Sequence, residues 1–115
     1  MLLSYLRYVA KRKNEFHIHS PFVYTLYTKV IRGGDEEALK ALGIERTVIV
    51  KDEEVPVGDG KVMYVVDGIH HDQKKEAFWN TICDLPDVTL TIDLYDKGLF
   101  FYREGMEKQH FILKK

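Results

Sequence analysis

The chain has 115 residues, of which 45% are hydrophobic and 12% aromatic, and its formal net charge is −1. A chain of this length forms one domain, or one half of a larger one, and this share of apolar residues fills a core, which excludes an intrinsically disordered protein. The nearly neutral balance gives no reason to expect a nucleic-acid partner. A single cysteine, Cys83, excludes an internal disulfide and paired-cysteine motifs, and favours a reducing, cytoplasmic compartment.

The start of the chain has a helical pattern. Apolar residues recur there at helical spacing: Leu2, Leu3, Leu6, Val9 and Ala10. This predicts an amphipathic helix over residues 2–13 that packs its apolar side on the rest of the domain. The alternative is that its basic side lies on an acidic membrane surface, for which one short stripe gives weak attachment. No apolar run approaches the roughly 18 residues that a membrane span needs.

Two further helices are predicted before the first strand. Ser20 is suited to cap a helix whose first position is Pro21, where a missing N–H costs nothing. A short helix then lies between Asp35, as its cap, and Gly43, as its terminator. The first two predicted helices make residues 1–33 a helical amino-terminal part, whose charges are mostly basic.

After Gly43 the apolar pattern becomes that of strands. The β-branched run "RTVIVKD" predicts a strand over residues 47–51. "KVMYVVD", residues 61–67, is a continuous apolar run, as is typical of a strand buried on both faces. Residues 34–60 as a whole form an acidic connecting part, and "EEVPVGDG" within them is rich in turn residues.

A helix and a hairpin complete the chain. Asp72 is expected to cap a helix to about residue 85, with Phe78, Ile82 and Leu85 facing inward. In the next segment, residues 88–95, every second residue is apolar, which predicts a half-buried strand. The residues between the apolar ones are Thr89, Thr91, Asp93 and Tyr95.

The last segments complete a mixed sheet. A turn around Asp96, Lys97 and Gly98 returns the chain into "LFFYR", and "HFILK" predicts a last strand. Residues 61–115 therefore form a βαββ carboxyl-terminal part. The predicted fold class is α/β, with amino-terminal helices packed on a small mixed sheet of four or five strands.

Two ends of the chain resemble a known family. "YLRYVAKRKNEFHIHSPFVYTLYTKVI" resembles the amino-terminal helices of a group of class I S-adenosylmethionine-dependent methyltransferases best represented in Bacteroidetes. "VMYVVDGIHHDQKKEAFWNTICDLPDVTLTIDLYDKGLFFYREGMEKQHFILKK" resembles the carboxyl terminus of the same group, where "VDDIH" ends a strand and "TIDL", "GL.FF" and "KQHF" follow. The resemblance implies a Rossmann-like methyltransferase fold that ends in an antiparallel hairpin.

The middle of the chain departs from that family. Residues 34–60 are too few for its first strand, glycine-rich cofactor turn, ribose-binding acid and fourth strand, and "GDG" at 58–60 is an isolated turn. The chain is therefore similar to such a methyltransferase with its central cofactor-binding part missing. No cofactor is expected for this chain alone, although the intact family uses S-adenosylmethionine. The implied function is a methyltransferase-family protein that is catalytically incompetent by itself.

The candidate substrate-binding residues are one acid and four histidines: His17, His19, Asp67, His70 and His71. Asp67 ends the buried strand, where open α/β sheets bind ligands. In related catechol-type enzymes, two neighbouring acids at this place help to hold a divalent cation, but Gly68 follows here. One carboxylate is a poor site for such an ion, so a turn or helix cap is the favoured role. A metal cluster of the histidines with Asp72 is a further, weaker alternative, and no metal is expected.

The remaining features favour packing or association over catalysis. Cys83 has no basic neighbour in sequence to lower its pKa, so it is expected in the core or at its boundary. The alternative function is a non-enzymatic oligomerisation or protein-interaction module. Loss of the central strands would leave the sheet edge beside residues 61–67 unpaired, and a homodimer would cover that edge.

Overall fold

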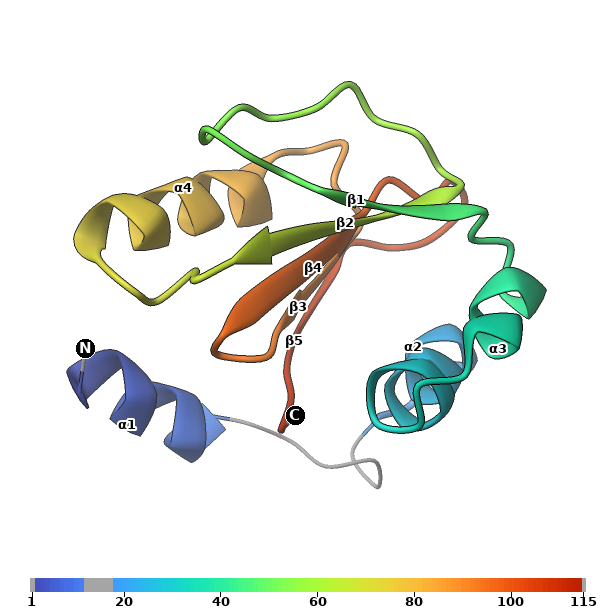
Figure 1. Ribbon diagram of the computed structural model, residues 1–115, viewed down its shortest axis with the longest axis horizontal. Coiled ribbons are helices and arrows are strands. Elements are labelled where there is room, and N and C mark those ends of the chain that lie inside the picture. The colour runs from blue at the N-terminus through green and yellow to red at the C-terminus, as the bar shows by residue number, and fades with distance from the viewer. Residues whose placement is uncertain (1, 12–17, 115) are drawn as a thin grey trace.

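The computed structural model describes residues 2–11 and 18–114 and shows an α/β fold around one five-stranded mixed sheet (Figure 1). The strands are β1 (Arg46–Ile49), β2 (Val62–Asp67), β3 (Leu90–Asp93), β4 (Lys97–Phe101) and β5 (Gln109–Ile112). Their order in the sheet is β1-β2-β4-β3-β5. The β1/β2 and β3/β5 pairs are parallel, whereas β4 is antiparallel to both of its neighbours. The predicted α/β class and mixed sheet are confirmed.

The helices begin where the sequence predicts. They are α1 (Leu2–Lys11), α2 (Pro21–Thr25), the π-helix η2 (Leu26–Ile31), α3 (Glu36–Ala41) and α4 (Gln73–Asp84). The side chains of Ser20, Asp35 and Asp72 accept hydrogen bonds from backbone N–H groups three residues on, as N-caps do. The second predicted helix is α2 continued directly by η2.

The sheet has a separate apolar core on each face. On one face, α2, η2 and α3 pack against alternate residues of the strands, including Leu90, Ile92, Leu99 and Phe101. On the other face lies α4, whose Trp79 and Ile82 pack against β2 and against Phe100 of β4. In Figure 1, α4 and the 50–61 connection lie above the sheet, and α2, η2 and α3 lie to the right.

The buried face of α4 differs from the predicted one. Trp79 and Ile82 are fully buried, whereas Phe78 and Leu85 are only half-buried. The Trp79 ring lies directly over Gly98 in β4, where a Cβ atom would stand 2.4 Å from the ring. Gly98 was expected in the hairpin turn, but the turn lies earlier, at Tyr95, whose φ is +68°. The absence of a side chain at Gly98 is what lets the indole reach the sheet.

The prediction that residues 88–95 form a half-buried strand was wrong in its burial and its length. All four residues of β3 are buried, including the polar Thr91 and Asp93. The side that carries them faces α4 and not solvent, because a helix covers each face of the sheet. Asp93 is therefore a carboxylate in the protein interior, which requires partners there.

The expected packing of the first helix was also wrong. Leu3, Leu6 and Val9 are exposed, to 65%, 53% and 36%, so the apolar stripe faces outward. The helix is held instead by Tyr8, which is buried and donates a hydrogen bond to the carbonyl of Leu113. The predicted last residues, 12 and 13, lie outside the described residues.

The sheet edge expected beside residues 61–67 is occupied. β1 pairs with β2 over four residues, so the open edges are those of β1 and β5. The strand predicted over residues 47–51 is therefore present as β1, and the expectation that the edge beside residues 61–67 is unpaired was wrong. Among the described residues, no helix combines the length and the apolar character needed to cross a membrane.

Candidate functional site

A cavity of about 270 Å³ lies between α1, α4 and the strands β3 and β5. Its lining combines cationic, acidic and imidazole side chains with one indole wall. The lining residues are Arg7, Tyr8, Lys11, His70, Glu76, Trp79, Asn80, Cys83, Asp93, His110 and Ile112. We call this cavity the His70 pocket. It is the place where ionisable groups from five separate segments meet.

His70 is held between two carboxylates. Its Nε2 is 2.6 Å from Asp93 Oδ2, and its Nδ1 is 3.0 Å from Glu76 Oε2. Asp93 ends β3, Glu76 lies in the first turn of α4, and the loop after β2 carries His70 between them. Since each ring nitrogen faces an acceptor, the imidazolium, which donates from both nitrogens, satisfies the arrangement best.

The pKa of His70 follows from this arrangement. Partial burial of the ring lowers the pKa, but the hydrogen bonds to Asp93 and Glu76 outweigh burial and raise it above its ordinary value of 6.5. Asp93 is only 5% exposed, and it also accepts a hydrogen bond from the N–H of Tyr95. The two carboxylates therefore favour the protonated form of the His70 ring.

Tyr95 connects the His70 pocket to the first helix. Its ring stacks on the His70 imidazole, with centroids 5.3 Å apart and planes 20° apart. On α1, the rings of Tyr5 and Tyr8 contact the same Tyr95 ring, at 5.1 and 5.4 Å. This aromatic cluster fixes α1 against the loop that carries the histidine, so the helix forms one wall of the pocket.

A second imidazole lies on the β5 side of the pocket. His110 Nδ1 is 2.6 Å from Thr91 Oγ1 and 3.9 Å from Cys83 Sγ. Although the residue retains solvent contact, partial burial of its ring lowers its pKa, and Lys108 and Lys11 act in the same direction while Asp93 opposes them. The pKa values of the two imidazoles in the pocket are therefore shifted in opposite directions.

The thiol of Cys83 is unreactive by its environment. Burial raises its pKa to about 11, and the nearby Asp93 and Asp84 carboxylates act in the same direction. At pH 8 we expect this thiol to react with a disulfide reagent roughly 100-fold more slowly in the folded protein than in urea, because the thiolate is the reacting form. Equal rates in both states would contradict the buried, protonated thiol.

Arg7 and Lys11 form the cationic wall of the pocket. They lie four residues apart on α1, so both face the same side of the helix. Within residues 2–11 and 18–114, neither forms a salt bridge. The wall therefore presents positive charge toward the cavity without an acidic partner on the described part of the chain.

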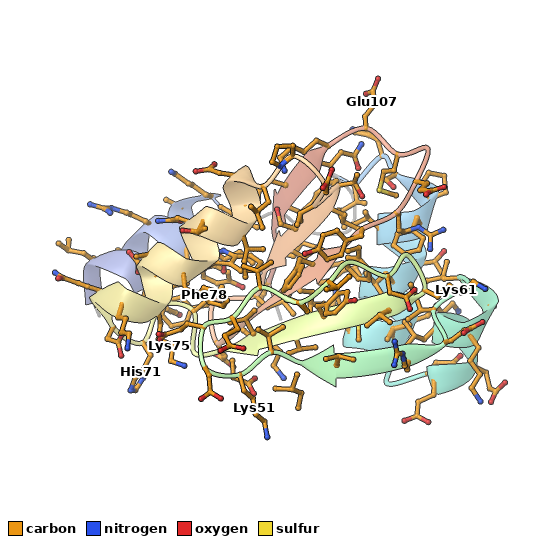
Figure 2. The ribbon with its side chains drawn as sticks, turned by 90° about the horizontal axis from the view of Figure 1, so that it is seen from above. Lys51, Lys61, His71, Lys75, Phe78 and Glu107 are labelled. Atoms are coloured by element: carbon orange, nitrogen blue, oxygen red, sulfur yellow. The ribbon has the colours of Figure 1, made fainter. Side chains whose placement is uncertain are left out.

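Of the predicted site residues that the structure describes, one lines the pocket. His70 lies in it, whereas His71 points outward beside the start of α4 (Figure 2). Asp67 is exposed and lines a different, apolar cavity of about 370 Å³ on the η2 face of the sheet. His19 is exposed just before α2, and His17 lies outside the described residues.

The sequence pattern did not indicate the other ionisable residues of the pocket. Asp93 was assigned to the solvent side of a strand, Glu76 was not singled out, and His110 was noted only within the "KQHF" motif. The available signal was the alternation in residues 88–95, which places Thr91 and Asp93 on one face. In the part of the chain that the structure describes, no three His, Cys, Asp or Glu side chains are grouped to hold a metal ion.

No protein-family model, curated protein or solved structure matches this chain.

Proposed function

We propose that this protein is a relative of the class I methyltransferases that does not bind S-adenosylmethionine and is catalytically incompetent alone. In place of the cofactor cleft it uses the His70 pocket as its ligand site. The proposal draws on the resemblance of both ends of the sequence. It is compatible with the mixed sheet, in which a buried strand, a helix and a hairpin follow one another as β2, α4, β3 and β4.

The observation that carries the proposal is the chain path after the parallel strands β1 and β2. A nucleotide cofactor needs a glycine turn there, where the backbone approaches the ligand and leads into a helix. After β1 the chain turns instead at Asp52 and Glu53, with φ of +59° and +54°, and continues to β2 without a helix. After β2, Gly68 has an ordinary turn role: its N–H donates to Asp96 O.

Calorimetry tests this proposal. Titration of the purified chain with S-adenosylmethionine and with S-adenosylhomocysteine is expected to show no saturable heat, since no turn in residues 46–73 supports the cofactor. Saturable binding of either compound would overturn the incompetence of the chain, and methyl-acceptor substrates would then be worth screening.

The alternative function is an oligomerisation module, and the open edge of β1 favours it. Ile49 is 54% exposed at this edge and adjoins the apolar cavity on the η2 face. An antiparallel pairing of two copies about Val48 would place Glu45 of each opposite Lys51 of the other. Opposite charges facing each other across two strands stabilise such a pairing.

Light scattering separates the two functions. A dimer through β1 predicts twice the chain mass, and Ile49→Lys is expected to return the mass to that of one chain. Val57→Lys is the matched control, because Val57 is 94% exposed in the 50–61 connection and belongs to no strand. A monomer at all concentrations, or a dimer that Ile49→Lys leaves intact, would exclude this interface.

A further inference from the structure

We propose that the His70 pocket binds a small molecule through a phosphate group, held by Arg7 and Lys11 of α1 and by the His110 imidazole. This inference rests on the part of the proposed function that makes the pocket a ligand site, and not on the loss of the cofactor cleft. The charges, the donor positions and the size of the cavity each support it.

The charge of the pocket favours an anion. Its two carboxylates, Asp93 and Glu76, both lie within hydrogen-bond distance of the His70 ring, at 2.6 and 3.0 Å. A protonated His70 therefore offsets part of their charge where they stand. Arg7 and Lys11 face the same cavity from α1 without a salt bridge to any residue of the described chain. With His70 protonated, three cations line a cavity that contains two anions.

The donors are arranged for a group with several oxygens. Arg7 and Lys11 stand about one helical turn apart on one side of α1. Across the cavity, His110 has its Nδ1 at the Thr91 hydroxyl, which leaves Nε2 as the ring nitrogen available to a ligand. Lys11 and His110 are close enough for the ammonium charge to act on the ring. Cations from one element and an imidazole from another suit a phosphate, whose oxygens point in several directions, better than a planar carboxylate.

The cavity also sets the size of the ligand. At about 270 Å³ it is below the usual range for drug-sized ligands, which is about 300–1,000 Å³. Trp79 and Ile112 supply an apolar wall beside the charged groups. The ligand class is therefore a small phosphate monoester, and larger nucleotides would not be enclosed.

A titration followed by nuclear magnetic resonance tests the inference. Inorganic phosphate is added to the full chain at pH 8 and constant ionic strength, and the ring signals of His110 and His70 are recorded. Saturable shifts of the His110 signals are expected with phosphate, and weaker or no shifts with acetate. Equal response to both anions would overturn the preference for phosphate, and no response to phosphate would overturn the site.

Matched variants locate the binding. Arg7→Gln with Lys11→Gln is expected to weaken phosphate binding at least about tenfold, since hydrogen bonds to charged groups are the strong ones. Lys29→Gln, which removes an exposed cation of η2 on the opposite face of the sheet, is expected to leave it unchanged. Equal loss in both variants would show non-specific binding. Arg7 and Lys11 are both exposed, so the double variant is expected to fold, and circular dichroism verifies this.

The calorimetric and spectroscopic results are independent of each other. Phosphate binding together with S-adenosylmethionine binding would overturn the proposed incompetence and leave the phosphate site standing. Absence of both would remove the phosphate site and leave the incompetence intact.

Discussion

Gly98→Ala is expected to destabilise the fold by about 3 kcal/mol, near the upper end for overpacking of a well-packed interior. An added Cβ would stand 2.4–2.7 Å from three carbons of the Trp79 ring, which is 2% exposed, so the ring must shift from its packed position. Gly98 is in the centre of the sheet, between Val66 of β2 and Asp93 of β3, so the strand is also fixed. Urea unfolding followed by circular dichroism measures the change, since Trp79 is the single tryptophan of the sequence and is itself replaced in one of the variants below.

Two variants separate the clash from a general effect of replacing glycine. Gly105→Ala changes a glycine with φ of +73° and nothing within 4 Å of the added atom, so only a backbone cost of about 1 kcal/mol is expected. Combining Gly98→Ala with Trp79→Leu should recover at least about 1 kcal/mol relative to the sum of the single changes. Additive effects, or a Gly98→Ala cost no larger than that of Gly105→Ala, would contradict the packing of the indole on β4.

Asp93→Asn is expected to destabilise the protein by about 2 kcal/mol at pH 6, as the loss of a hydrogen bond to a charged group does. The carboxylate is buried and stands 2.6 Å from His70 Nε2, and an amide cannot offset the imidazolium charge. The pKa of His70 should also fall, because Asp93 is the first of the partners that raise it. Chemical denaturation and histidine resonances measure the two effects.

The stabilisation by the Asp93–His70 pair is expected to decrease as the pH rises. A pKa raised on folding contributes stability that is complete below the ordinary value of 6.5 and is lost as pH rises through the folded-state pKa. The destabilisation by Asp93→Asn should therefore be largest near pH 6 and smaller at pH 9. Other charged or titratable groups of the pocket are Glu76 on α4, Arg7 and Lys11 on α1, and His110 on β5. The pKa of His110 is shifted in the opposite direction.

Asp67→Asn is the matched control for this carboxylate. It removes an acid from the exposed end of β2, outside the His70 pocket, and a change within about 0.5 kcal/mol is expected. A larger loss for Asp67→Asn than for Asp93→Asn, or a destabilisation by Asp93→Asn that grows with pH, would contradict the ion pair.

The helix starts and the buried strand β2 could be predicted from the sequence, because their signals act over a few residues. The caps at Ser20, Asp35 and Asp72 are properties of one helix end, and the apolar run of β2 requires burial whatever covers it. The strand order and the position of β1 depend on pairing between distant segments. Local pattern does not specify such pairing.

The candidate site could be predicted only at His70. Its two partners are 6 and 23 residues away, and Asp93 resembled a solvent-side residue because its strand alternates in polarity. Only the placement of α4 over that face turns the alternation into a buried polar cluster. In the same way, the outward apolar stripe of α1 follows from the anchoring of Tyr8 at Leu113, a contact between the two ends of the chain.

The most direct test of the His70 pocket is a nitrogen-15 measurement of the histidine side chains between pH 5 and 9. The pKa of His70 is expected above 6.5, because Asp93 and Glu76 accept from its two ring nitrogens, and the pKa of His110 is expected below 6.5. If His70 instead became neutral at or below pH 6.5, the ion pairing of His70 with Asp93 and Glu76 would be contradicted.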